Sequence, residues 1–284
     1  MFTHTLSSQN LLKLSHETSN EVLVFDCRHD LMNPEWGRAQ YDLAHIQGAR
    51  FAGLDDDLSG AKTGRNGRHP LPDRPTFVQW LANQGVRKDS QIVCYDQLDG
   101  MFAARLWWMC RWAGLKNVAV LEAGYAGWCL AGGAVTDTVH TPVPSAAFDL
   151  PTLETVLSMA DVQAHLKTPA FTLLDARAPE RFRGEIEPLD AKAGHIPGAL
   201  NRVFKRNVDA NGYFVSDLAK QLQALSAATA GLPLAHQCGS GVTACHNILA
   251  LHVAGLKQAH EPSALYAGSW SEWSSETSNP VATG

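Results

Sequence analysis

The chain carries two series of short apolar segments that alternate with longer stretches of helical periodicity. In the first half, residues 22–28 and 91–96 each have the length and composition of a buried strand, and polar residues and a helical stretch follow each of them. Residues 171–177 and 233–238 follow the same plan in the second half. Short strands that alternate with helices are typical of a parallel sheet with helices on both faces. The pattern therefore predicts an α/β fold in each half.

The two halves repeat the same motifs at a nearly constant offset. The first strand of each half ends in Asp-x-Arg, at 26–28 and again 149 positions later at 175–177. A His-Ile-x-Gly-Ala turn follows each strand, beginning at His45 and at His195. Because both halves have this histidine, we expect it to hold the turn. The period far exceeds the roughly 20–50 residues of stacked repeats, so the sequence predicts two tandem domains.

A change in composition indicates where the two domains divide. Residues 139–149 are rich in Thr, Pro, Ser and Ala and lack the periodic pattern, which is typical of a linker. We therefore expect domains at 1–138 and 150–284. A chain of 284 residues with 45% hydrophobic residues is long enough for each domain to bury its own core.

Charge and cysteine content exclude several classes of protein. The net charge of −5 gives no basic footprint, so we expect no nucleic-acid or membrane partner. No apolar run approaches the roughly 18 residues of a membrane span, and residues 1–20 lack a secretory pattern. The six cysteines form no Cys-x-x-Cys pair, which argues against zinc and favours a reducing compartment. We expect a cytoplasmic monomer with no metal and no other cofactor.

Cys238 differs from the other cysteines in the loop that follows it. Gly239 and Gly241 allow the backbone to curl so that its N–H groups point inward and form an anion-binding nest. A helix is predicted from about 244 to 253, and its positive N-terminal end favours a thiolate at Cys238. Thr243 is expected to cap this helix through its hydroxyl. The pattern indicates a reactive cysteine rather than a metal ligand.

Two other interpretations of Cys238 have to be compared with this one. A cysteine is often a small buried hydrophobic residue, and we assign that role to Cys27, Cys94, Cys110, Cys129 and, with a redox role left open, Cys245. A cysteine before a glycine-rich loop also suggests a phosphatase, which needs an arginine at the end of the loop to hold phosphoryl oxygens. Ala244 stands there instead, and this argues against phosphoryl transfer.

The repeated Asp-x-Arg and His-Ile-x-Gly-Ala units, together with the loop Cys-Gly-Ser-Gly-Val-Thr-Ala, resemble the two-domain rhodanese superfamily. The resemblance extends from about residue 22 to 273 and is strongest, at the loop, to 3-mercaptopyruvate sulfurtransferases. It implies two rhodanese-like domains in tandem. Asp96 stands where a second cysteine would lie in the first domain, so that domain is expected to be catalytically silent.

The resemblance also implies roles for individual residues. Cys238 matches the sulfur-carrying nucleophile, and Ser240, His69 and Asp55 match a proton relay. Arg181 matches the arginine that binds the carboxylate of the donor, although Arg183 could face the site instead. The loop residues Gly239, Gly241, Val242 and Thr243 are expected to contact the anionic donor.

The loop composition bears on which donor is used. The thiosulfate branch of the family has basic residues where this sequence has Gly239 and Ser240. Mercaptopyruvate needs a nearby hydroxyl to protonate its enolate and an arginine further out. The expected activity is therefore sulfur transfer from 3-mercaptopyruvate, through a Cys238 persulfide, to a thiol, cyanide or thioredoxin. One departure counts against this donor, because Leu189 stands where the family usually has a second arginine.

Two alternatives remain open at this point. The same cysteine could accept sulfur from thiosulfate, or the chain could be a non-catalytic rhodanese-like module that binds partners or senses oxidants. Retention of the complete loop at Cys238 argues against the second.

Overall fold

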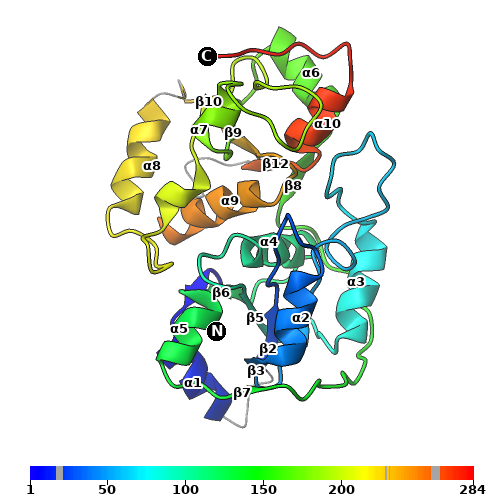
Figure 1. Cartoon of the computed structure of the whole chain (residues 1–284), viewed down its shortest axis with the longest axis vertical. Coiled ribbons are helices and arrows are strands. Elements are labelled where there is room, and N and C mark those ends of the chain that lie inside the picture. The colour runs from blue at the N-terminus through cyan, green and yellow to red at the C-terminus, as the bar shows by residue number, and fades with distance from the viewer. Residues whose placement is uncertain (17–21, 228, 230, 257–262) are drawn as a thin grey trace. The chain divides into compact units, whose positions relative to one another are not determined.

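The computed structural model describes most of the chain in two compact units, coloured from blue to red along the sequence in Figure 1. The described residues are 1–16, 22–227, 229, 231–256 and 263–284. Unit 1 comprises residues 1–60, 72–153 and 210–213, and unit 2 comprises residues 61–71, 154–209 and 214–284. The expected linker 139–149 thus lies within unit 1, and the segment 61–71 belongs to unit 2 by its contacts. None of the helices described is long and apolar enough to cross a membrane.

Unit 1 is built around a parallel sheet. Among the described residues this sheet has five strands in the order β1-β6-β5-β2-β4. The strands β3 and β7 form a separate antiparallel pair. The elements in chain order are β1 (Thr5–Leu6), α1 (Ser8–His16), β2 (Val22–Asp26), α2 (Trp36–Leu43), β3 (His45–Ile46), β4 (Arg50–Phe51), α3 (Arg74–Asn83), β5 (Gln91–Tyr95), α4 (Ala103–Trp112), β6 (Val118–Leu121), α5 (Gly124–Leu130) and β7 (Val135–Thr136).

Unit 2 repeats this sheet. Its described strands have the order β10-β9-β11-β12-β8, again parallel throughout. The elements are β8 (Thr155–Leu157), α6 (Met159–Lys167), β9 (Thr172–Asp175), α7 (Pro179–Phe182), β10 (Leu200–Asn201), a 3₁₀ helix (Phe204–Asn207), α8 (Leu218–Ala227), β11 (Leu234–Gln237), α9 (Thr243–Val253), β12 (Ala264–Tyr266) and α10 (Ser269–Ser275).

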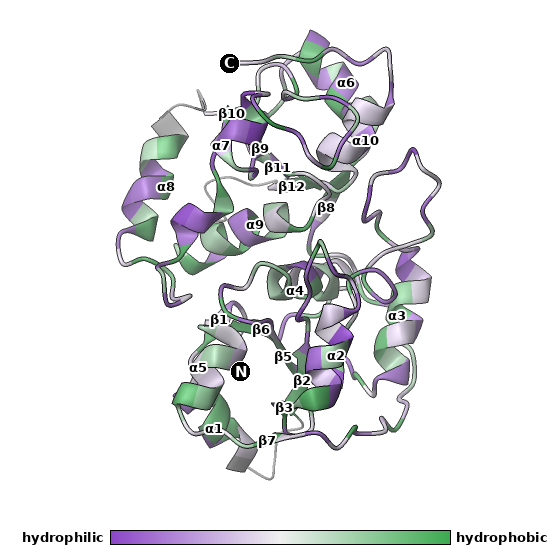
Figure 2. Ribbon diagram, viewed as in Figure 1, coloured by the Kyte–Doolittle hydropathy of each residue, from purple (hydrophilic) through white to green (hydrophobic). Residues whose placement is uncertain are grey.

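Helices cover both faces of the second sheet because successive strand residues point to opposite sides. Leu173 of β9 packs in one core with side chains of α6 and α10, among them Trp270 and Trp273. The next residue, Leu174, packs in a second core with Leu218 of α8 and with side chains of α9. Figure 2 shows green and purple bands along α8, as expected of a helix with one buried face. The predicted α/β fold is confirmed.

The Asp-x-Arg motif forms a buried ion pair at the end of β2 in unit 1 and of β9 in unit 2. In unit 2, Arg177 donates from Nε and Nη2 to the Asp175 carboxylate, with a shortest distance of 2.6 Å. Nη2 also donates to the carbonyl of Gly194, just before the His-Ile turn. In unit 1, Arg28 binds Asp26 in the same way and reaches the carbonyl before the first turn. Each arginine therefore ties a strand end to a turn.

The histidine of each turn is held by the main chain. His45 Nδ1 lies 2.7 Å from the carbonyl oxygen of Tyr41, whose ring stacks on the imidazole. His195 Nδ1 lies 2.8 Å from the carbonyl oxygen of Phe182, and those two rings also stack. The same contacts in both units support a structural role for the two histidines.

Asp96 occupies the position in unit 1 that corresponds to Cys238 in unit 2. The strand registers show the correspondence. The residue before Asp96 pairs with the aspartate of the first Asp-x-Arg motif, and the residue before Cys238 pairs with the aspartate of the second. The buried Asp96 carboxylate accepts four main-chain N–H groups at 2.8–3.2 Å, from Leu98, Gly100, Phe102 and Ala103. The loop of the first repeat is therefore an anion nest, and the anion in it belongs to the protein.

Burial raises the pKa of Asp96 to about 6, and Asp99 adds to the rise while the main-chain donors oppose it. In the unfolded chain an aspartate titrates near about 3.9. The folded protein therefore binds the extra proton between about pH 4 and pH 6, and the stability that this proton contributes is lost as the pH rises through that window. The free energy of unfolding is expected to fall by about 3 kcal/mol across this window.

We predict that urea unfolding will show this pH dependence in wild type and that Asp96→Asn will abolish it. The quantity to compare is the difference in unfolding free energy between the two proteins from pH 4.5 to 7.5. The wild type should lose stability relative to the variant as the pH rises. A difference that stays constant with pH would show that Asp96 titrates like an ordinary aspartate.

Candidate functional site

Cys238 follows directly after β11, which lies between β9 and β12 in the sheet of unit 2. Its N–H donates to Ser269 Oγ at 3.1 Å, and its carbonyl accepts the N–H of Trp270 at 3.0 Å. Ser269 has a φ of +56°, a conformation that is strained for a residue other than glycine. Cys238 is only 2% exposed. The start of α10 thus fixes the backbone of the cysteine.

The loop after Cys238 requires glycine at position 241. Gly241 has a φ of +76°, and a Cβ placed there would lie 2.4 Å from the carbonyl oxygen of Ala267. The helix α9 then begins at Thr243, with Val242 as its N-cap residue and no side-chain cap. The expectation that Thr243 caps the helix is therefore wrong. Thr243 is already the first residue of the helix, so its hydroxyl does not take the N-cap position from which a side chain accepts the unpaired N–H groups.

Ser240 and His69 lie together in unit 2 although 171 residues separate them in the chain. His69 Nδ1 is 2.8 Å from Ser240 Oγ, and both side chains are buried. The segment 61–71 therefore delivers its histidine to the loop two residues after the cysteine. A serine in contact with an imidazole is an arrangement that can pass a proton.

The main chain of the segment 61–71 docks on α10. The N–H of Arg68 donates to Ser271 Oγ at 3.0 Å. Gly67 has a φ of +85°, and a Cβ placed there would lie 2.8 Å from the carbonyl oxygen of Gly268. Only glycine meets both conditions. This approach of two backbones sets the position of Arg68 and of His69 after it.

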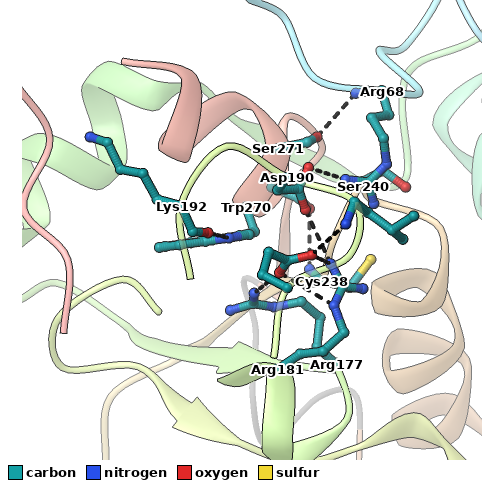
Figure 3. A network of polar contacts seen from close by, with 12 residues as sticks. Arg68, Arg177, Arg181, Asp190, Lys192, Cys238, Ser240, Trp270 and Ser271 are labelled. Carbon is teal, nitrogen blue, oxygen red and sulfur yellow. Dashed lines mark hydrogen bonds and ion pairs between the residues drawn. The ribbon is translucent and has the colours of Figure 1, made fainter. Parts of the chain in front are cut away.

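Arg181 belongs to a network of ion pairs beside the loop, drawn in Figure 3. Its Nη2 donates to Glu187 at 2.6 Å and to Asp190 at 3.1 Å, and Glu187 also accepts from Arg177 at 3.4 Å. Arg183, by contrast, is exposed and pairs with Glu185. Of the two arginines that flank Phe182, it is Arg181 that lies beside the loop.

Arg68 lies at the same place and was not among the residues singled out in the sequence. Its Nη1 binds the second oxygen of Asp190. A Cβ on Gly239 would lie 2.8 Å from Arg68 Nη2 and 3.4 Å from Arg181 Nη1. Both guanidinium groups therefore approach the residue next to Cys238. In the sequence, only the position of Arg68 directly before His69 could have indicated that it lies near the loop. That position became informative when the structure placed His69 against Ser240.

Asp55 lies in unit 1, on the loop after β4. Its Oδ2 is 3.9 Å from His29 Nε2, and its side chain is 27% exposed. Asp57 instead accepts the N–H of Gly53 at 2.8 Å, and burial raises the pKa of this second carboxyl group. Asp55 and Asp57 therefore have distinct surroundings. The part of Asp55 in a proton relay stays a prediction.

The other cysteines differ from the expectation in one case. Burial raises the pKa of three thiols in unit 1, those of Cys27, Cys94 and Cys110. Cys245 is also buried, and its thiol donates to the carbonyl of Gly241 at 3.3 Å. Cys129 is exposed, so its assignment to the core is wrong. The helix α5 buries Gly127 and Trp128 and leaves Cys129 in its outer last turn. Among the described residues, no group of three or more potential ligand side chains is arranged to hold a metal ion.

Comparison with known proteins identifies the fold and its relatives. The family model described as "Rhodanese-like domain" matches residues 8–131 and 158–276. A protein of Pseudomonas aeruginosa named probable 3-mercaptopyruvate sulfurtransferase is 45% identical over 93% of this chain and 93% of its own. A putative thiosulfate sulfurtransferase, SseB, of Mycobacterium tuberculosis is 35% identical over 94% of this chain and 93% of its own.

A solved structure agrees with these sequence matches. The 3-mercaptopyruvate sulfurtransferase from Leishmania major superposes with a TM-score of 0.80 and is 27% identical, covering 96% of this chain and 74% of its own. The matched segments contain both Asp-x-Arg motifs and the complete loop at Cys238. Two copies of one α/β unit, with the cysteine loop in the second, identify this chain as a member of the rhodanese family.

Proposed function

We propose that the protein is a sulfurtransferase that takes sulfur from 3-mercaptopyruvate and carries it as a persulfide on Cys238. The observation that supports this most directly is the 2.8 Å contact between His69 Nδ1 and Ser240 Oγ. A donor whose leaving group is an enolate needs a proton, and this pair lies two residues from the nucleophile. The name of the 45% identical relative from Pseudomonas aeruginosa supports the same donor.

The first half-reaction transfers the sulfur to the enzyme. The Cys238 thiolate attacks the sulfur of mercaptopyruvate, an S–S bond forms, and the C–S bond of the donor breaks. The electron pair of that bond passes to the enolate of pyruvate, which takes a proton from the pair Ser240 and His69, with Asp55 as a further member of the relay. The loop amides of Gly239, Gly241, Val242 and Thr243 stabilise the persulfide anion.

The second half-reaction removes the sulfur. A thiolate acceptor, cyanide or reduced thioredoxin attacks the outer sulfur of the Cys238 persulfide. The S–S bond on the enzyme breaks and its electron pair returns to the cysteine as thiolate. The first domain has Asp96 in place of a nucleophile, so we infer that it is catalytically silent. We also propose that the protein works as a monomer in the cytoplasm.

Thiosulfate is the second candidate donor, and the two guanidinium groups beside Gly239 favour it. A dianion gains more than a monoanion from nearby cations. The cations of the network are, however, matched in number by carboxylates, since Arg68, Arg177 and Arg181 are bound by Asp175, Glu187 and Asp190. The matched charges favour the monoanionic donor.

We predict that the purified protein will release pyruvate from 3-mercaptopyruvate faster than it releases sulfite from thiosulfate, with cyanide as acceptor in both assays. After donor treatment without acceptor, mass spectrometry should find about 32 Da added on Cys238, the mass of one sulfur atom. Cys238→Ser should abolish both the release and the adduct. Cys129→Ser, which alters an exposed cysteine, should leave both unchanged.

The results distinguish the three hypotheses, namely a 3-mercaptopyruvate sulfurtransferase, a thiosulfate sulfurtransferase and a non-catalytic module. A large preference for thiosulfate would replace the proposed donor but keep Cys238 as the nucleophile. Absence of the adduct with both donors would favour a non-catalytic module.

A second prediction concerns the proton donor. Ser240→Ala and His69→Asn should each lower kcat with 3-mercaptopyruvate by about 10²–10⁴-fold, the usual range for loss of general acid catalysis. With thiosulfate the loss should be much smaller, because sulfite leaves without a proton on carbon. Steady-state kinetics with both donors measure the two losses. Equal losses with both donors would show that the pair only shapes the loop.

A further inference from the structure

A buried arginine of unit 2, Arg202, has a guanidinium group that forms no hydrogen bond within the described part of the chain. Arg202 directly follows β10, which is the edge strand of the sheet in unit 2 (Figure 1). The residue is 5% exposed, and its three guanidinium nitrogens are buried without an acceptor among the described residues. Burial of an unpaired charge is costly, so a buried arginine normally has an anionic partner. Arg28 and Arg177 follow this rule, because each of them binds an aspartate.

The charged group that acts on Arg202 is another cation. Burial, with a smaller contribution from the positive charge of Arg206, lowers the pKa of Arg202 to about 10. Arg206 lies four residues further along, in the 3₁₀ helix, and is exposed. Two neighbouring guanidinium groups repel each other. An anion bound between them would remove this repulsion and supply the acceptors that Arg202 lacks.

The first repeat indicates that the fold does not need an arginine at this position. Ala52 is the counterpart of Arg202, because each directly follows the residue that pairs with the aspartate of its Asp-x-Arg motif. The N–H of Ala52 donates to the carbonyl of Asp26 at 2.8 Å, and the N–H of Arg202 donates to the carbonyl of Asp175 at 2.9 Å. The two units therefore share this main-chain contact, and only the unit with Cys238 places a cation there.

A network of buried side chains fixes the main chain that carries the two arginines. The carbonyl of Arg202 accepts from Asn247 Nδ2 at 2.9 Å, and Asn247 Oδ1 accepts from Asn207 Nδ2 at 2.8 Å. Asn207 Nδ2 also lies 3.0 Å from His246 Nδ1. Arg206 stands between the two anchored positions, 202 and 207. The segment is therefore held on the beginning of α9, as a preformed binding site requires.

Arg202 lies at the same end of the sheet as Cys238. Asn201 and Gln237 both pair with Asp175, so Arg202 and Cys238 are level with each other on two strands that β9 separates. Neighbouring strands are about 4.8 Å apart, which places the two main chains about 10 Å from each other. Ligands of open parallel sheets bind outside this carboxyl end of the strands. A small molecule of a few bonds can therefore span from Arg202 to the sulfur of Cys238.

We propose that Arg202 and Arg206 form a binding site for the oxyanion group of a small molecule, separate from the ion-pair network beside Gly239. An oxyanion fits because it both neutralises two cations and accepts several guanidinium N–H groups. Two sources can supply this group, a thiol acceptor that carries a carboxylate and an inorganic oxyanion. The first source rests on the proposed function, since it requires a thiol to remove sulfur from Cys238, and the second does not.

Sulfate is the probe for the site. Urea unfolding is measured in sodium sulfate and in sodium chloride at equal ionic strength, for wild type and for Arg202→Met, which replaces the guanidinium with an uncharged side chain. Sulfate at about ten times its dissociation constant should raise the folding equilibrium constant about tenfold more in wild type than in the variant. The general effect of sulfate on hydrophobic burial is common to both proteins and cancels in this comparison.

Two further variants keep the measurement decisive. Lys220→Ala, which removes an exposed lysine of α8, should respond to sulfate like wild type. If Arg202→Met does not fold, Arg206→Ala provides the comparison, because its side chain is exposed, and the sulfate response should fall about threefold. An equal response to sulfate in wild type and in the folded arginine variant would overturn the proposal. This measurement involves no sulfur transfer, so it stays valid for the site even if the proposed function fails.

The rate at which two thiols discharge the Cys238 persulfide distinguishes the two sources. The thiolate attacks the outer sulfur, a new S–S bond forms, and the electron pair of the enzyme S–S bond returns to the cysteine. The reagents 3-mercaptopropionate and 2-mercaptoethanol share a mercaptoethyl group and differ in carrying a carboxylate or a hydroxyl. If the acceptor carboxylate binds at Arg202, Arg202→Met should lower the ratio of their rates about tenfold, the effect of one charge-assisted hydrogen bond. An unchanged ratio together with a lost sulfate response would support the site with an inorganic oxyanion as its ligand.

Discussion

The buried ion pair between Asp175 and Arg177 is the interaction on which the geometry of the second domain depends. It joins the end of a central strand to the turn at His195 through the carbonyl of Gly194. The same arginine extends to Glu187, and through it to Arg181. Removing one partner of such a pair leaves an uncompensated buried charge and costs about 3–5 kcal/mol. The ion pair thus couples the stability of the sheet to the position of Arg181 beside the loop.

The position of the cysteine and the duplicated sheets could be predicted because they follow from local patterns. An apolar strand, two glycines and a helix specify the loop at Cys238 wherever the rest of the chain lies. The place of Arg68 could not be predicted in this way. It depends on contacts with Gly268 and Ser271, some 200 positions away, which no periodicity reveals.

The errors have equally local causes. Thr243 is of a type that often caps helices, but the turn at Gly241 brings the helix start one residue earlier, so Thr243 is already inside it. Cys129 lies in an apolar stretch, but α5 is short and buries only the side that carries Trp128. Residue type and pattern predict that a helix exists more securely than which residue its last turn exposes.

The carboxylate of Asp96 gives the duplication a further meaning. In the first domain, four main-chain donors are satisfied as soon as the chain folds, because the anion they bind is attached to the backbone. The main-chain donors of that loop therefore need no bound ligand. In the second domain Cys238 stands at the same point, and its side chain carries a sulfur atom in place of the carboxylate. The two repeats thus share one loop position, where a carboxylate satisfies the main-chain donors in the first and a cysteine leaves the loop open to an external anion in the second.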